Sequence, residues 1–103
     1  MSEENKTSKD FPYLKKLEDA MENAKAKTAK KSHMKKKYNA GASKIAKKMG
    51  EEAVEMVIAS GFDDDQEFLE ESADVLYYYL LALHDRGYEL KDVLLILQKR
   101  DRK

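Results

Sequence analysis

Two short acidic runs are the part of this chain whose residue types and spacing could do chemistry. Glu51, Glu52 and Glu55 form an EExxE pattern, and Glu71 and Asp74 form an ExxD pattern after a gap of fifteen residues. Both runs lie within otherwise apolar, helix-patterned sequence, where buried acids cost free energy unless positive charge neutralises them. Carboxylate oxygens are the ligands that hard divalent cations select. The two runs therefore predict a metal site, and with it a reaction on phosphates.

The spacing within each run places its acids on one helix face. Residues three or four apart are neighbours on a helix, so Glu52 lies beside Glu55. Glu71 lies beside Asp74 in the same way. The connection between the two helices, about residues 61–64, is short enough to make them antiparallel neighbours. We expect the two acidic pairs to face each other and to suit Mg²⁺, or Mn²⁺, with the remaining positions filled by water and a substrate phosphate.

Either motif alone is typical of a solvated helix face, and two on consecutive helices favour the metal site. Other candidates have simpler interpretations. The run Asp63-Asp64-Asp65 lacks the glycine and the spacing of an EF-hand, and it fits the negative charge preferred at a helix N-terminus. His33 and His84 are isolated and neither has a nearby Cys or Ser that suggests a nucleophile, so we expect each to be a surface or packing residue.

The rest of the sequence predicts an all-α domain, an antiparallel bundle of four to five helices. The chain has one proline, four glycines and no strand-type alternation. Residues 1–9 read as disordered, and residues 10–103 read as a single domain. A first helix begins near residues 10–12 and fades in the lysine-rich segment Lys25–Lys37, which either continues it or forms a short second helix.

Three further helices are predicted at about residues 44–60, 65–86 and 90–100. Ser43 is the expected N-cap of the first of them, and Gly61 and Gly87 mark two C-terminal stops. The expected inward faces of the last two helices are Leu69, Ala73, Leu76, Leu80 and Leu83, and then Leu90, Val93, Leu94 and Leu97. The longest helix carries more apolar surface than one small bundle can cover, so we expect a homodimer.

Charge is divided unevenly although the net charge is zero. Residues 1–50 hold fourteen lysines and six acids, whereas residues 51–103 hold fourteen acids and six Lys or Arg. Carboxylates for a cation beside lysines for an anion suit a metal-and-phosphate site. Nucleic-acid binding is disfavoured because the basic half has no Arg and no interleaved aromatics. The polar N-terminus, the lack of cysteine and the lack of a membrane-length apolar stretch predict a cytoplasmic protein with no membrane partner.

Three stretches of the sequence resemble one known family. Residues 44–59, Lys44-Ile45-Ala46-Lys47-Lys48-Met49-Gly50-Glu51-Glu52-Ala53-Val54-Glu55-Met56-Val57-Ile58-Ala59, are similar to the central motif of the phosphoribosyl-ATP pyrophosphohydrolases. Residues 70–77 and the tail from Arg86-Gly87 through Asp92-Val93-Leu94 are similar as well. This family belongs to the all-α nucleoside triphosphate pyrophosphohydrolases, which share EExxE followed by ExxD. The likeness covers about residues 41–100.

The resemblance implies Mg²⁺-dependent hydrolysis of phosphoribosyl-ATP to phosphoribosyl-AMP and pyrophosphate, the second step of histidine biosynthesis. The metal ligands implied by motif position are Glu52, Glu55, Glu71 and Asp74. Glu51 would assist as a ligand or by orienting water. The implied substrate contacts are Lys44, Lys47, Lys48, Ser32 and Tyr78.

Two departures from the family pattern leave the substrate open. Ser32-His33-Met34 stands where the family usually has Ser-Tyr-Thr, and Tyr77-Tyr78 stands where it commonly has Tyr-His. One alternative is a house-cleaning nucleoside triphosphate pyrophosphohydrolase that acts on another nucleotide. A second alternative is a non-catalytic helical interaction module, which would neither bind Mg²⁺ specifically nor release pyrophosphate.

Overall fold

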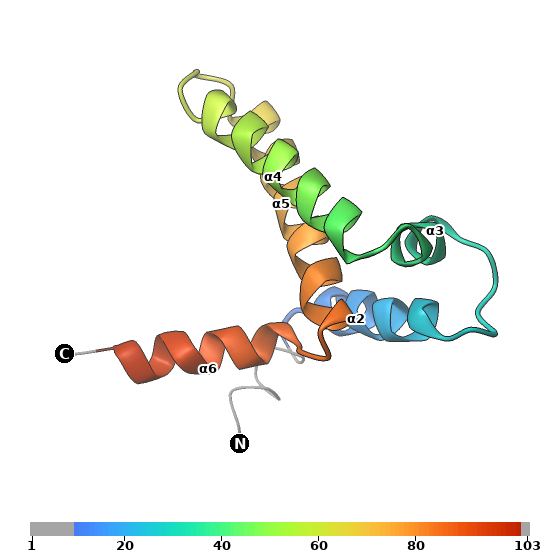
Figure 1. Ribbon diagram of the computed structural model, residues 1–103. Helices are drawn as coiled ribbons and strands as arrows, with labels where there is room; N and C mark the ends of the chain where they lie inside the picture. The colour runs from blue at the N-terminus through green and yellow to red at the C-terminus, as the bar shows by residue number, and fades with distance from the viewer. Residues whose placement is uncertain (1–9, 102–103) are drawn as a thin grey trace.

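The computed structural model describes residues 10–101, and all regular secondary structure in that range is α-helical. The helices, labelled as in Figure 1, are α2 (Pro12–Lys25), α3 (His33–Ala40), α4 (Ala42–Ala59), α5 (Asp65–Asp85) and α6 (Leu90–Arg100). The all-α prediction is confirmed. The lysine-rich segment does not continue the first helix, because the chain leaves helical geometry after Lys25 and α3 begins at His33. The predicted disorder of residues 1–9 lies outside the described residues.

Short polar and glycine signals set the helix boundaries. Ser32 caps α3 by accepting a hydrogen bond from the Lys35 amide, and Asp64 caps α5 by accepting one from the Glu67 amide. The predicted N-cap at Ser43 is wrong. Gly41 alone separates α3 from α4, and its φ of 102° turns the chain directly from one helix into the next.

Helices α4 and α5 form an antiparallel hairpin that makes the most extensive helix–helix contact in the described chain. In Figure 1 this hairpin stands out from the rest, while α2 and α3 lie beside its base. The hairpin is the element that must position the two acidic runs, because one run lies on each of its helices. The predicted antiparallel pairing of these helices is therefore confirmed.

The hydrophobic core lies at the base of the hairpin. Its fully enclosed side chains come from α2, α4 and α5, and are Met21, Ile45, Leu80 and Leu81. Leu14 and Leu17 of α2 and Tyr38 of α3 pack against this group. Phe11, the residue just before α2, is 66% exposed. No helix within residues 10–101 is long and apolar enough to cross a membrane.

Two predicted core faces are only partly correct: Leu80 lies in the core and Leu83 and Leu90 pack against it, but the rest of each face is largely exposed. Leu69 and Leu76 are 61% and 44% exposed, and Ala73 is exposed too, because no other helix covers the outer half of the hairpin. Leu94 and Leu97 are 41% and 54% exposed, because α6 extends away from the body (Figure 1). The radius of gyration is 15.2 Å. A compact chain of this length would have about 13 Å.

Candidate metal centre

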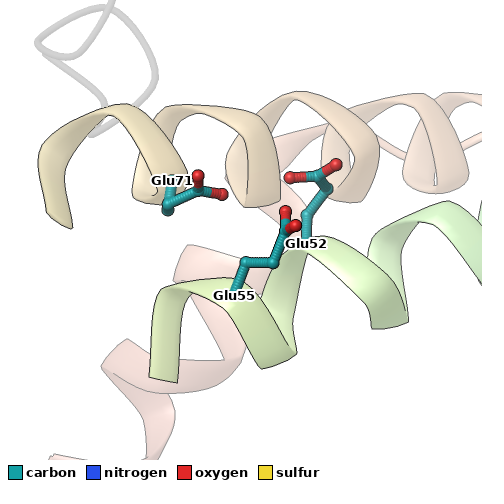
Figure 2. A group of neighbouring side chains, drawn as sticks. All are labelled: Glu52, Glu55 and Glu71. Carbon is teal, nitrogen blue, oxygen red and sulfur yellow. The ribbon is translucent and has the colours of Figure 1, made fainter. Parts of the chain in front are cut away.

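Three carboxylates from the two acidic runs meet between α4 and α5. Figure 2 shows Glu52 and Glu55 of α4 directed toward Glu71 of α5. Each of the three offers one oxygen, and these oxygens lie within 4.8 Å of one another. We call this group the acidic trio. The expectation that acids from both helices converge is met by three of the four predicted ligands.

Burial and mutual repulsion raise the pKa of two acids of this group, Glu52 and Glu71. The Glu52 side chain is 14% exposed. The pKa of Glu52 is raised to about 7. The largest cause is burial, followed by the hydrogen bond and charge of Glu55 and then by the charges of Asp74 and Glu71. Burial and then the charge of Glu55 also raise the pKa of Glu71. Like charges this close are unfavourable without a counter-charge, so the trio is an electrostatically unsatisfied arrangement of the protein alone.

One atom of the trio is left without any partner. Glu71 Oε2 is buried and accepts no hydrogen bond from the part of the chain that the structure describes. Nearly all buried polar atoms in folded proteins have a partner, so such an atom calls for an explanation. An all-oxygen donor set with one orphaned carboxylate oxygen fits a hard divalent cation such as Mg²⁺ or Mn²⁺.

The fourth predicted ligand, Asp74, is not part of the trio. It is exposed, although its charge is close enough to help raise the pKa of Glu52. Glu51 is also exposed, and its Oε1 lies 3.4 Å from the ammonium of Lys48. Glu51 therefore lies at the rim of the site rather than inside it, as its position at the edge of the helix face predicts.

Positive charge reaches the trio only at its edge. The Lys48 ammonium lies 4.0 Å from Glu52 Oε1 as well as near Glu51, and its hydrogen bond to Glu51 raises the pKa of Lys48. Lys44 and Lys47 are exposed on the same helix. None of these lysines contacts Glu71 Oε2, so the orphaned atom is left for a ligand from outside the chain.

The remaining predicted contacts, Ser32 and Tyr78, lie on other elements. The Ser32 hydroxyl is engaged as the cap of α3. Tyr78 is half-buried on α5, and its ring packs edge to face against Tyr77 with centroids 5.5 Å apart. The sequence analysis missed Lys37, whose ammonium lies against both rings. The spacing of Lys37 from Met34 and Tyr38, which pack against the core, is the signal that could have separated it from the solvated lysines.

Known proteins of matching sequence were found by comparison. Phosphoribosyl-ATP pyrophosphatase of Pyrobaculum neutrophilum is 36% identical over 89 residues, which is 86% of this chain and 95% of that protein. The protein of the same name in Streptococcus gordonii is 47% identical over 66 residues, or 64% of either chain. The histidine biosynthesis bifunctional protein HisIE of Buchnera aphidicola is 35% identical over 88 residues, which is 85% of this chain.

Coverage differs between these relatives. This chain spans 42% of the length of that bifunctional protein, but nearly all of the Pyrobaculum protein. The profile that describes phosphoribosyl-ATP pyrophosphohydrolases matches residues 14–101, a range that includes both acidic runs and all of α3 to α6. On this match, and on the geometry of the trio, the chain belongs to the phosphoribosyl-ATP pyrophosphohydrolase family.

Proposed function

We propose that this protein hydrolyses phosphoribosyl-ATP to phosphoribosyl-AMP and pyrophosphate, the second step of histidine biosynthesis, and that it uses Mg²⁺. The observation that carries the proposal is the convergence of the acidic trio around the unpartnered Glu71 Oε2. Family membership supplies the substrate class, and the relatives named phosphoribosyl-ATP pyrophosphatase support it.

In this proposal the trio, Glu52, Glu55 and Glu71, holds the cation, and Asp74 stands one helical turn beyond Glu71 to join it. When bound, Mg²⁺ neutralises phosphate charge and favours attack by water. Glu51, at the rim, orients the attacking water and takes its proton. The water oxygen attacks the α-phosphorus in line, the bond to the bridging oxygen breaks, and pyrophosphate leaves. The chain needs no covalent nucleophile, so its contribution is positioning and charge.

Pyrophosphate release tests the proposal. The protein is incubated with phosphoribosyl-ATP and a panel of nucleoside triphosphates, with and without Mg²⁺. We expect release from phosphoribosyl-ATP that requires the metal. Glu55→Gln should lower turnover by roughly 100- to 1,000-fold, as loss of a transition-state electrostatic group does. Glu70→Gln, an exposed acid of α5 outside the trio, is the matched control. Near-normal turnover of Glu55→Gln at saturating Mg²⁺ would show that the ligand assignment is wrong.

A second candidate substrate is another nucleoside triphosphate, removed in a house-cleaning role. Two features favour it. Tyr78 stands where the resemblance leads us to expect a histidine, and the Ser32 hydroxyl is already engaged in capping α3. The same panel decides between the two substrates, because this candidate requires faster pyrophosphate release from a simple triphosphate than from phosphoribosyl-ATP. Absence of release from every compound would instead support a non-catalytic interaction module.

We also propose that the protein works as a homodimer. The outer half of the hairpin exposes large apolar side chains that no other part of the described chain covers, among them Val54, Val57, Ile58, Phe62 and Leu69, each at least 57% exposed. Such contiguous exposure is typical of an association surface. A second copy of the hairpin would offer a matching apolar face. A monomeric mass by light scattering at micromolar concentration would refute this proposal.

A further inference from the structure

Lys37 is a lysine of α3 that is directed at α5. Its ammonium lies 5.8 Å from the centroid of the Tyr77 ring and 6.0 Å from that of Tyr78, which is the range of cation–π attraction. Both rings pack against the hydrophobic core. The ammonium is therefore held in a defined place by two aromatic side chains that are themselves fixed.

The charge of Lys37 has no carboxylate partner within residues 10–101. By contrast, Lys15, Lys25 and Lys48 each form an ion pair with a nearby acid. Aromatic faces attract a cation without neutralising it, so the half-buried Lys37 keeps its full charge for an anion from outside the chain. Lys48, the other cation near the trio, is already shared between Glu51 and Glu52.

Lys37 lies at one end of the helix face that carries the candidate metal ligands. Glu71, Asp74 and Tyr78 follow one another along α5 at spacings of three and four residues, so they share a face. The seven residues from Glu71 to Tyr78 correspond to a rise of about 10 Å. Tyr78 also lies near Lys48 of α4, since its charge helps to raise the pKa of Lys48. Lys37 therefore contacts α5 about two helical turns C-terminal to Glu71.

The proposed substrate carries phosphate at two separate places. Its triphosphate must lie at the metal centre, where the bond is cut, whereas the single phosphate on its added ribose is remote from the reaction. We propose that Lys37 binds this remote phosphate, and that it thereby favours phosphoribosyl-ATP over ATP, which lacks that group. This inference rests on the function proposed above and goes beyond it by naming a specificity contact. In this proposal the contact is made equally in the ground state and in the transition state, so its loss raises KM and leaves kcat unchanged.

Paired kinetics on two compounds test the proposal. The values of kcat and KM for phosphoribosyl-ATP, and the KM or competitive inhibition constant of ATP, are measured for wild type, Lys37→Met, Lys37→Arg and Lys36→Met. Lys36 is the matched control, because it is the neighbouring lysine of α3 and is exposed. We expect Lys37→Met to raise the KM for phosphoribosyl-ATP by roughly 10- to 100-fold, the effect of losing one charge-assisted hydrogen bond. Its kcat and its interaction with ATP should stay within about twofold.

The conservative variant and a binding probe complete the test. Lys37→Arg should retain most of the affinity for phosphoribosyl-ATP, and Lys36→Met should behave as wild type. Ribose 5-phosphate should inhibit the wild type competitively and inhibit Lys37→Met at least tenfold more weakly. Thermal melting of Lys37→Met at the wild-type temperature shows that its fold is intact.

The outcomes separate this inference from the proposed function. If the wild type cleaves phosphoribosyl-ATP and Lys37→Met has the same KM, the inference is overturned and the proposed function stands. Equal losses of affinity for phosphoribosyl-ATP and ATP in Lys37→Met would also overturn the inference, because Lys37 would then contact the triphosphate or support the fold. If the wild type releases pyrophosphate from no compound, both proposals are wrong.

Discussion

Carboxylates gather against α5 in two regions, and within residues 10–101 the two groups differ in what lies between their acids. Near the C-terminal end of α5, His84 is 1% exposed and lies between two acids of α2. Its Nε2 is 2.7 Å from Glu18 Oε2, and its Nδ1 is 2.5 Å from Glu22 Oε2. Near the N-terminal end of α5, the described residues place no such side chain between the acids of the trio, and the Lys48 ammonium reaches only Glu52, at 4.0 Å.

Further hydrogen bonds surround the acids near His84. Lys25 donates to Glu22 and to the His84 carbonyl, and the Leu90 amide at the start of α6 donates to Glu18. Each ring nitrogen of His84 faces a carboxylate oxygen, so both can donate only when the ring carries two protons. The hydrogen bond from His84 lowers the pKa of Glu22, whereas the pKa of Glu52 is raised to about 7.

The comparison shows that a cluster of acids has a structural role where its oxygens have hydrogen-bond partners, and indicates a ligand site where they have none. The group around His84 joins α2, α5 and the start of α6, so its charges are used to hold the fold. The acids of the trio repel one another, and a bound proton or cation relieves that repulsion. A functional site can therefore be recognised by buried polar groups that lack hydrogen-bond partners.

Removing His84 should have the largest effect on stability. His84→Ala leaves a cavity and removes the ring that is hydrogen-bonded to both Glu18 and Glu22, so we expect the free energy of unfolding to fall by about 3 kcal/mol or more. Urea unfolding followed by circular dichroism measures this. His33→Ala is the matched control, because His33 is exposed, and it should change stability by less than about 0.5 kcal/mol. A loss in His84→Ala no greater than in the control would contradict the role given to the histidine.

Adding Mg²⁺ should stabilise the protein through the trio and not through His84. At a free concentration 100 times the dissociation constant, one bound ion adds about 2.7 kcal/mol. Thermal unfolding is measured with and without the ion. Mg²⁺ should raise the melting temperature of Glu70→Gln but not that of Glu71→Gln. Without metal, Glu71→Gln should be more stable than wild type, since it removes one of the crowded charges. An equal Mg²⁺ shift in both variants would place the ion elsewhere.

Changing pH should act in opposite directions on the two regions. The pKa of Glu52 is raised, so its protonation stabilises the folded state fully below its ordinary value near 4.5, and this contribution is lost as pH rises through about 7. The pKa of Glu22 is lowered, so its contribution is present above the ordinary value and is lost as pH falls. Glu52→Gln should therefore remove a decline in metal-free stability between pH 4.5 and 7. An unchanged decline in this variant would show that Glu52 does not cause it.

Local patterns in the sequence predicted the features that neighbouring residues determine. Glycine stops and three- and four-residue spacings located the helices to within a few residues, and the same spacings placed Glu52 beside Glu55. The likeness of residues 44–59 to a family motif was confirmed by the match over residues 14–101. Mg²⁺, the homodimer and the cytoplasmic location remain predictions.

Features that depend on distant parts of the chain were not visible in the sequence. His84 reads as isolated because its partners Glu18 and Glu22 lie 66 and 62 residues away. Lys37 reads as one of a solvated lysine run because its aromatic contacts lie on α5. Leu69 and Leu76 were predicted to be core residues because apolar periodicity identifies the apolar face of a helix. The pattern does not show whether that face is covered by the same chain or by a partner.

Gly41 determines how α3 is oriented relative to the α4–α5 hairpin. It is the sole residue between α3, which carries Lys37, and α4, which carries two acids of the trio. A side chain there would meet no atom within 4 Å, so only the backbone conformation at φ 102° restricts that position. Because the joint is a single residue, any substitution that changed its backbone angles would turn α3 relative to α4. Such a change would displace Lys37 from the acids of the trio without touching either site directly.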